Sequence, residues 1–128
     1  MHSISEIHGV RVLTAEPETP TLGSEDDAVE LIGQAYGEYA SVVAVPVARV
    51  DERFFMLSTR VAGEVVRKFQ SYRVVLAVLG DLGAYLTSDS FQAFVHETNK
   101  GTDVWFLDGR AALHERLRAA AETLGRSQ

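Results

Sequence analysis

Side chains that can carry charge or accept a phosphate gather around one strand-to-helix connection near the middle of the chain. Ser58 and Thr59 precede a predicted helix, and Arg60 and Glu64 fall in its first turns. A phosphate on either hydroxyl would meet free N–H groups, the positive end of the helix dipole and the charge of Arg60. Two roles fit Ser58 and Thr59: a phosphoacceptor pair, or a plain helix N-cap that contributes about 1 kcal/mol.

Glu64 also admits two roles. One turn into the helix, it can face the same edge as a general base or as a contact to a partner. Arg60, Glu64 and Lys68 are spaced i, i+4, i+8, however, and this spacing suits exposed ion pairs of about 0.3–0.5 kcal/mol each. Gly63 costs about 1 kcal/mol inside a helix. We therefore expect a neighbouring strand, or alternatively a ligand, close to its backbone.

Asp81 lies between Gly80 and Leu82 just after an apolar run, where functional carboxylates are often found. Asp51 and Asp108 are expected at the same edge, and three carboxylates there would suit Mg²⁺. The alternative is that Asp81 caps the loop that leads to the next helix. We favour this capping role and predict neither a metal ion nor another cofactor.

Phe54 and Phe55 are adjacent, so in an extended segment their rings point in opposite directions. We expect one ring in the core and the other exposed, where it would contact a protein partner. Together with the polar groups nearby, the predicted binding residues are Phe54, Phe55, Ser58, Thr59, Arg60, Glu64 and Asp81. The chain contains no GxGxxG, GxxxxGK, HExxH or GxSxG motif, so we predict no catalytic residue.

Composition narrows the classes of protein further. The chain has 128 residues, 46% of them hydrophobic, which suits a single domain spanning residues 1–128 with a real core. Its 18 acidic and 12 basic residues give a net charge of -6, which argues against nucleic acid and anionic membranes as partners. There is no cysteine to form a disulfide. Without a signal peptide or a membrane-length apolar run, the chain is predicted to be soluble and cytoplasmic.

Alternating apolar patterns predict the elements that hold these residues. Two short strands in residues 4–15 turn at His8-Gly9, and a loop follows at 16–23. The remaining predicted elements are a helix at 24–39, a strand at 42–47, a helix capped by Ser58 or Thr59 and running to 71, a strand at 73–79, a helix starting at Thr87 or Ser88, a strand at 104–107 and a helix at 110–124. Pro46 is expected to mark either the end of its strand or an edge of the sheet.

The resulting order, β-β-α-β-α-β-α-β-α, predicts an α/β fold. After an N-terminal hairpin, helices alternate with parallel strands and pack on a mixed sheet. Functional sites in such sheets gather at the C-terminal ends of the parallel strands, which here are residues 50–60, 80–88 and 108–110. The first two helices are expected to point Tyr36, Tyr39 and Tyr72 toward the core.

An apolar strand, an acidic loop, Ser58-Thr59, a helix and a second apolar strand follow one another in residues 42–79. This order resembles a STAS domain, the fold of bacterial anti-sigma-factor antagonists. In STAS regulators the helix begins with Asp-Ser-Ser/Thr-Gly-Leu, and a partner kinase phosphorylates the Ser. Leu57 stands here in place of the Asp, and Arg60 in place of the Gly. The resemblance implies a STAS-like fold and a regulatory role, with less room for a partner near the backbone of Arg60.

A second pattern covers nearly the whole chain and is most specific in residues 54–101. It consists of Phe54-Phe55, Ala62-Gly63-Glu64, Lys68-Phe69, Tyr72-Arg73, Leu76-Ala77, Gly80-Asp81, Glu97, Asn99 and Gly101. These residues resemble an uncharacterised bacterial family, domain-of-unknown-function family 4180. Arg67 and Ser71 depart from the usual Gln and Asn of that family. The resemblance implies an α/β fold of STAS type and no particular reaction.

These observations favour a non-enzymatic protein-interaction or regulatory domain that docks an unidentified protein through residues 54–64 and 80–88. The alternative is a small-molecule or nucleotide-binding protein, or an enzyme, that uses the same edge with Glu64 and Asp81 as its polar groups. A homodimer is a third hypothesis, because exposed sheet edges can pair.

Overall fold

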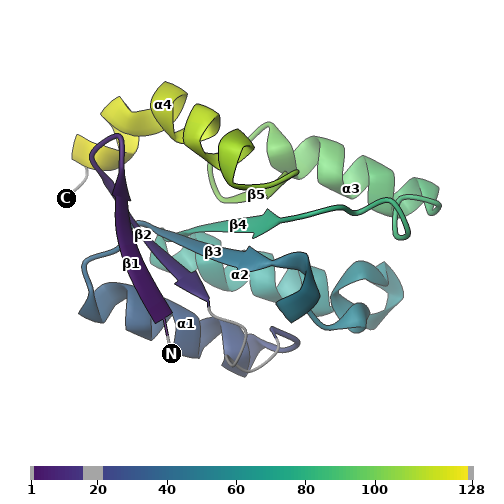
Figure 1. The fold of residues 1–128 in the computed structure, drawn as a ribbon. Coiled ribbons are helices and arrows are strands. Elements are labelled where there is room, and N and C mark those ends of the chain that lie inside the picture. The colour runs from purple at the N-terminus through teal and green to yellow at the C-terminus, as the bar shows by residue number, and fades with distance from the viewer. Residues whose placement is uncertain (1, 16–21, 127–128) are drawn as a thin grey trace.

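In the described residues, five strands form one mixed sheet in the order β1-β2-β3-β4-β5 (Figure 1). The structure is a computed structural model and describes residues 2–15 and 22–126, with side chains described within residues 3–120. The strands are β1 (His2–Ile7), β2 (Val10–Ala15), β3 (Val42–Pro46), β4 (Val75–Leu79) and β5 (Val104–Leu107). β1 runs antiparallel to β2, and all other neighbours are parallel. The predicted α/β fold, with an N-terminal hairpin and a mixed sheet, is confirmed.

Within the same residues, four α-helices cover the two faces of the sheet. They are α1 (Glu25–Gly37), α2 (Val61–Tyr72), α3 (Asp89–Asn99) and α4 (Arg110–Arg126). Each parallel crossover moves one strand along the sheet in the same direction, so α1, α2 and α3 contribute to one face. The opposite face is covered by α4 (Figure 1). None of the described helices is both long and apolar enough to cross a bilayer.

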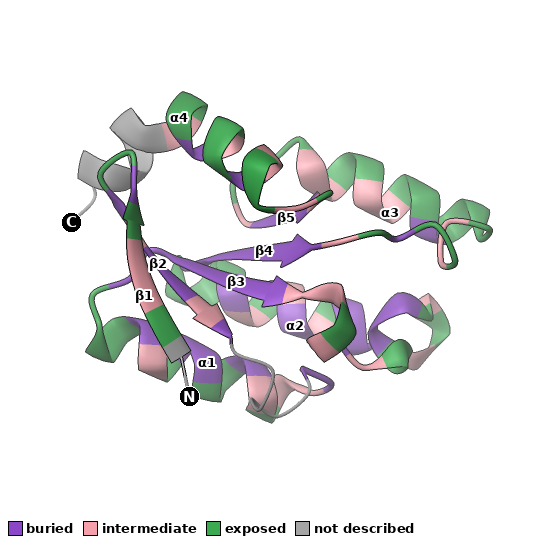
Figure 2. Cartoon of the chain, in the orientation of Figure 1, coloured by how far each residue is buried: buried purple, intermediate pink, exposed green. Residues whose placement is uncertain are grey.

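Strand side chains alternate between two apolar layers, and the buried strands lie between them (Figure 2). Val43 and Val45 of β3 belong to the layer under α1 and α2. Val42 and Ala44 belong to the layer under α4. Since both layers are covered by helices, β3 and β4 read as continuous apolar runs rather than as an alternation of apolar and polar residues. Pro46 ends β3, as predicted.

Two helices begin at serine N-caps, and the cap at Ser88 is one of the two predicted starts of its helix. The Ser24 hydroxyl accepts a hydrogen bond from the N–H of Asp27 at 3.2 Å, which begins α1. The Ser88 hydroxyl accepts one from the N–H of Phe91 at 3.2 Å, which begins α3. Residues 16–21 of the predicted loop lie outside the described residues.

The last turns of α1 and α2 differ from the prediction. Tyr36 and Tyr39 are 54% and 76% exposed, and Tyr72 is 42% exposed. The expected inward direction is wrong because these residues lie beside the connections that lead into β3 and β4, at Ala40 and Val74, rather than over the strands. The ends of the two helices therefore carry exposed aromatic rings.

Candidate functional site

The connections that follow β3 and β4 meet at the C-terminal end of the parallel strands, which we call the rim. The first connection runs through three 3₁₀ turns, η1 (Val47–Arg49), η2 (Glu52–Phe55) and η3 (Leu57–Thr59), before α2 begins. The second connection contains Tyr85, whose ring stacks on that of Phe55 with the centroids 4.0 Å apart. The two predicted segments, residues 54–64 and 80–88, therefore share one rim.

Phe54 and Phe55 lie inside this rim and not on its surface. They are 0% and 4% exposed, so the prediction of one exposed phenylalanine is wrong. The segment is a 3₁₀ turn rather than extended, and adjacent side chains then diverge by about 120° instead of pointing in opposite directions. Both rings join an aromatic cluster of Phe54, Phe55, Tyr85, Phe91, Phe94 and Phe106. This cluster supports the rim from below.

Asp51 and Arg53 fasten the turn that carries the two phenylalanines. One carboxylate oxygen of Asp51 accepts hydrogen bonds from the backbone N–H of Arg53 at 2.9 Å and from its Nε at 3.1 Å. The hydrogen-bonded guanidinium of Arg53 holds the pKa of Asp51 below its ordinary value of 3.8. Asp51 is therefore a charged cap of η2.

The hydroxyls of Ser58 and Thr59 differ in their accessibility. Thr59 Oγ1 lies 2.5 Å from the carbonyl oxygen of Arg53 and 2.7 Å from that of Met56, so it donates within its own turn. It also accepts a hydrogen bond from the N–H of Val61 at 3.3 Å. Ser58, in contrast, is exposed. The structure therefore separates two residues that the sequence treats as equivalent.

The N-cap of α2 is Arg60, whereas Ser58 or Thr59 was expected. Arg60 has a left-handed backbone conformation with φ of 66°, and its side chain makes no capping hydrogen bond. The left-handed conformation costs a residue other than glycine about 1–2 kcal/mol. The prediction is wrong by one or two residues because the final 3₁₀ turn extends to Thr59. Arg60 follows with a left-handed backbone, and α2 starts after it.

An open groove of about 530 Å³ lies between α2 and α3. We call it the α2–α3 groove, and its lining consists of Leu57, Arg60, Gly63, Glu64, Arg67 and Phe94. The groove forms because the backbone of α2 packs closely on α1 but stands farther from α3. Leu57 and Phe94 are partly buried against the core and give the groove an apolar base.

The charged side chains of this groove have no ion-pair partners among the described residues. Arg60, Glu64 and Arg67 form no salt bridge there. The predicted series of ion pairs from Arg60 through Glu64 to Lys68 is therefore wrong. Gly63 has open space where a Cβ would stand, so the prediction of a strand packed against its backbone is also wrong.

Asp81 lies at the rim but outside the groove. Its carboxylate accepts a hydrogen bond from the N–H of Gly83 at 2.8 Å, so it caps the loop that leads to α3. Glu64 lines the groove and Asp81 does not. In the part of the chain that the structure describes, no three His, Asp or Glu side chains are placed to hold a metal ion. Asp51, Asp81 and Asp108 accordingly form no Mg²⁺ site.

The family model described as a domain of unknown function, DUF4180, matches residues 7–117. The chain belongs to this family. No curated protein and no solved structure matches this chain. The resemblance to STAS domains stays a prediction.

In this DUF4180 domain, Asn99 has a clear structural role at the edge strand β5. Its side-chain amide accepts a hydrogen bond from the N–H of Phe106 at 2.6 Å and donates one to the carbonyl of the same residue at 3.1 Å. Arg116 donates to the carbonyl of Asn99 and lies over the Trp105 ring, 4.7 Å from its centroid. The Asn99 amide thus takes the place of a further strand and covers part of an edge that would otherwise be open.

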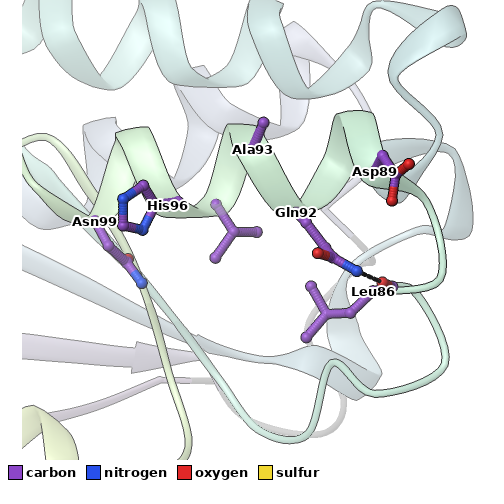
Figure 3. A pocket seen from close by; sticks show the side chains of 7 residues that line it. Leu86, Asp89, Gln92, Ala93, His96 and Asn99 are labelled. Carbon is purple, nitrogen blue, oxygen red and sulfur yellow. Dashed lines mark hydrogen bonds between the residues drawn. The ribbon is translucent and has the colours of Figure 1, made fainter.

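A wider and shallower hollow of about 750 Å³ lies on the outer face of α3 (Figure 3). It is lined by Leu86, Asp89, Gln92, Ala93, Val95, His96 and Asn99. Its amides are already in use, because Gln92 donates to the carbonyl of Leu86 and Asn99 bonds to β5. Asp89 and His96 are the remaining polar side chains of this hollow.

Another hollow, of about 490 Å³, lies where α1 and α2 end, opposite the rim. We call it the tyrosine hollow, and it is lined by Tyr36, Tyr39, Ala40, Ser41, Tyr72, Arg73 and Val74. The Tyr36 hydroxyl donates to the backbone carbonyl of Tyr72 at 2.6 Å, and the two rings meet edge to face with centroids 6.2 Å apart. Tyr36 and Tyr72 therefore tie the two helix ends together.

Two residues that line the groove, Arg67 and Phe94, lie outside the segments predicted from the sequence. In the sequence, Arg67 stands out only as a departure from the usual Gln of the family. It follows Arg60 by seven residues, however, and this spacing of two helical turns could have placed both on one face. Phe94 comes from another helix, and nothing in the sequence links it to α2.

Proposed function

We propose that this chain is a cytoplasmic, non-enzymatic protein-interaction or regulatory module whose partner docks in the α2–α3 groove. The observation that carries the proposal is an apolar base flanked by two exposed arginines, Arg60 and Arg67, that form no ion pair with any described residue. Arginine and exposed apolar side chains are enriched where proteins bind one another. Met56, at the same rim, is 55% exposed and adds apolar surface.

A substitution at Gly63 tests this docking site without disturbing the core. Gly63 faces open space, so the side chain of Gly63→Gln fits there and fills the groove. Gly33→Gln is the matched control, because Gly33 is also an exposed glycine within a helix and also faces open space. Both substitutions favour the helix by about 0.5–1 kcal/mol. A loss of binding by Gly63→Gln is therefore not a loss of folding.

The measurement is quantitative mass spectrometry of the proteins that three baits capture from the native host: wild type, Gly63→Gln and Gly33→Gln. We expect at least one protein that wild type and Gly33→Gln capture equally and that Gly63→Gln loses. If every enriched protein is captured equally by all three baits, the partner does not dock in the groove and the proposal fails.

A small-molecule or nucleotide ligand at the rim is the alternative. It predicts a thermal shift with nucleotides or metal ions that both Glu64→Gln and Asp81→Asn abolish. The position of Asp81 outside the groove, with its carboxylate bonded to Gly83, favours the protein partner instead.

Ser58 is the residue at which this proposal places covalent regulation. Its side chain is exposed beside the groove, whereas the Thr59 hydroxyl is held by the carbonyls of Arg53 and Met56. A phosphate on Ser58 would bring a charge of about -2 close to Arg60 and compete with the partner. Mass spectrometry of natively expressed protein should find phosphate on Ser58 and not on Thr59; phosphate confined to Thr59, or on neither residue, contradicts this role.

A second copy of the chain is a further proposed partner, through the free edge of β1. β1 ends the sheet, and no described strand lies beyond it. The opposite edge, at β5, is partly covered by the Asn99 amide. Light scattering over a range of protein concentrations should show a dimer, and a monomer mass throughout rejects this pairing.

A further inference from the structure

Arg60 and Arg67 both line the α2–α3 groove. Arg67 lies in the second turn of α2, and Arg60 is the N-cap just before the helix, so their backbones are about 10 Å apart. Both are exposed, and neither forms an ion pair with a described residue. A guanidinium can bind a carboxylate through two parallel hydrogen bonds. The groove therefore presents two carboxylate-binding groups.

The α2 side of the groove is positive although the chain as a whole is negative. On the α3 side, Asp89 and Glu97 do not line the groove. The net charge of the chain is -6, whereas α2 and its N-cap carry Arg60, Arg67 and Lys68 against the single carboxylate of Glu64. The N-terminal end of α2, where the Arg60 side chain makes no cap, adds the positive end of the helix dipole. Charge complementarity thus favours an acidic partner over a basic one.

The groups between the two arginines determine what the middle of the partner must be. Glu64 lies between them and disfavours a third carboxylate at that point. Leu57 and Phe94 offer apolar surface, and Gly63 leaves room above the helix for a side chain. An apolar side chain is therefore the group that suits the middle of the groove.

We propose, resting on the function proposed above, that the groove binds an acidic segment of a protein partner with an apolar anchor between two carboxylates. The spacing of the carboxylates follows from that of the arginines. In an extended segment, at about 3.3 Å per residue, they are three residues apart. In a helical segment they are about seven residues apart.

Selection of binding peptides from a random display library on the full chain tests this pattern. We expect enriched sequences with two acidic residues at one of these spacings and an aliphatic or aromatic residue between them. One enriched peptide is then titrated against wild type, Arg60→Glu, Arg67→Glu and Arg73→Glu. The Kd should rise about tenfold or more for the two groove variants.

Arg73→Glu is the matched control for charge reversal. Arg73 is also exposed, caps the other end of α2 and forms no ion pair with a described residue. Its reversal should change the Kd by less than about twofold, because Arg73 does not line the groove and exposed charges about a Debye length away are strongly screened. Thermal melts of all variants, followed by circular dichroism, show whether each variant is folded.

The outcomes separate this inference from the proposed function. Enriched peptides that lack acidic residues, but still lose binding to Gly63→Gln, overturn the acidic pattern and leave docking in the groove intact. Peptides that bind Gly63→Gln and Arg67→Glu as tightly as wild type overturn both. A selection that enriches no peptide above background overturns the inference as well.

Discussion

The α2–α3 groove and the tyrosine hollow are depressions of similar size at opposite ends of α2, with volumes of about 530 and 490 Å³. In the tyrosine hollow, Tyr36 and Tyr72 contact each other. The Tyr36 hydroxyl donates a hydrogen bond to the carbonyl of Tyr72, and the two rings pack edge to face. In the groove, the charged groups form no ion pair with the described residues.

This difference shows why exposed aromatic area is a poor guide to the site in this molecule. Of the five large apolar residues that are exposed in the described part of the chain, Tyr36, Tyr39 and Tyr72 belong to the tyrosine hollow. Two of these three, however, already hold the ends of α1 and α2 together. In the groove, Phe94 is partly buried, and Arg60, Glu64 and Arg67 form no ion pair with the described residues. The groove differs in having two guanidinium groups, Arg60 and Arg67, that form no ion pair with a described residue, whereas the tyrosine hollow has one, Arg73.

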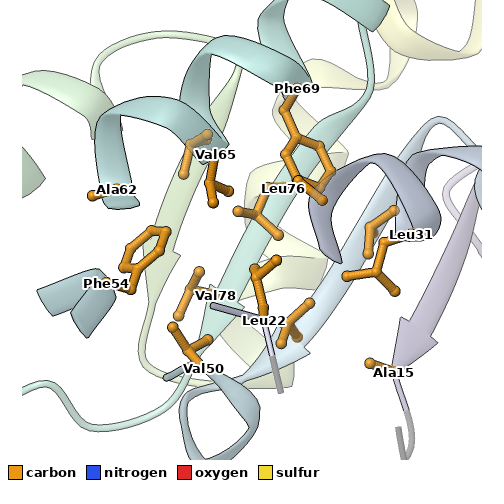
Figure 4. Packing of buried hydrophobic residues seen from close by; sticks show 14 of the residues in the cluster. Ala15, Leu22, Leu31, Val50, Phe54, Ala62, Val65, Phe69, Leu76 and Val78 are labelled. Carbon is orange, nitrogen blue, oxygen red and sulfur yellow. The ribbon is translucent and has the colours of Figure 1, made fainter. Parts of the chain in front are cut away.

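The largest effect is expected where the rim depends on its aromatic cluster. Phe54 is fully buried among the side chains shown in Figure 4, so Phe54→Ala should lower the free energy of unfolding by about 3–5 kcal/mol. Tyr39→Ala, at the exposed tip of the tyrosine hollow, should change it by less than about 0.5 kcal/mol. Urea unfolding measures both free energies. A similar loss for the two variants would contradict the claim that the aromatic cluster of the rim supports the fold more than the exposed tyrosines do.

Arg60→Gly separates stability from binding at the groove. Glycine relieves the left-handed strain at φ of 66°, and its greater freedom in the unfolded chain offsets part of the gain. The free energy of unfolding should therefore stay the same or rise by about 1 kcal/mol, while the affinity for the selected acidic peptide falls. Unfolding and binding measured on the same preparation test this; a variant that is clearly less stable would show that the arginine supports the fold.

Tyr36→Phe tests whether the tyrosine hollow is a structural clasp. It removes the hydroxyl that donates to the carbonyl of Tyr72 and keeps the ring. The expected loss is about 0.5–1.5 kcal/mol, at the lower end because the bond is exposed to water. The affinity for the acidic peptide should not change. A weaker affinity with unchanged stability would instead assign binding to the tyrosine hollow.

The smallest effect is expected for Asp51→Asn, which removes the charge of the η2 cap and keeps an oxygen acceptor. Because Arg53 lowers the pKa of Asp51 in the folded protein, the ionised carboxylate stabilises the fold above its ordinary pKa of 3.8, and this contribution disappears as the pH falls through the lowered value. Thermal midpoints should therefore be slightly lower for Asp51→Asn at neutral pH and converge with wild type in acid. A difference that grows in acid would contradict the assignment.

Much of the fold could be predicted because its signals are local or topological. The strands at β3, β4 and β5 are continuous apolar runs, as parallel strands covered on both faces must be. Parallel order in turn places the ends of β3 and β4 on one side, and the stacking of Phe55 on Tyr85 confirms that their connections meet there.

The path from β3 to α2 could not be predicted, because contacts between distant parts of the chain determine it. The turn at η2 is held by the pair of Asp51 and Arg53 and by the contact of Phe55 with a ring thirty residues further along the chain. From the sequence alone, residues around Phe54 and Phe55 are most simply interpreted as extended. That interpretation placed one of the two phenylalanines on the surface.

The groove has a similarly weak signal in the sequence. Its width reflects how far α2 stands from α3, and no short pattern encodes that distance. One local signal was available: Arg60 stands where the STAS pattern has glycine. The structure gives this position a left-handed backbone, which is the conformation that glycine favours. The left-handed arginine at this position is therefore both a backbone feature and a groove residue.

The most direct test of the account is a map of amide chemical shifts in the isotopically labelled chain, with and without the selected acidic peptide. We predict that the peptide shifts the signals of residues 57–67 and of Phe94, and leaves those of Tyr36, Tyr39 and Tyr72 in place. Shifts centred on the tyrosine hollow, with residues 57–67 unmoved, would contradict the claim that the unpaired charges beside α2 form the docking site.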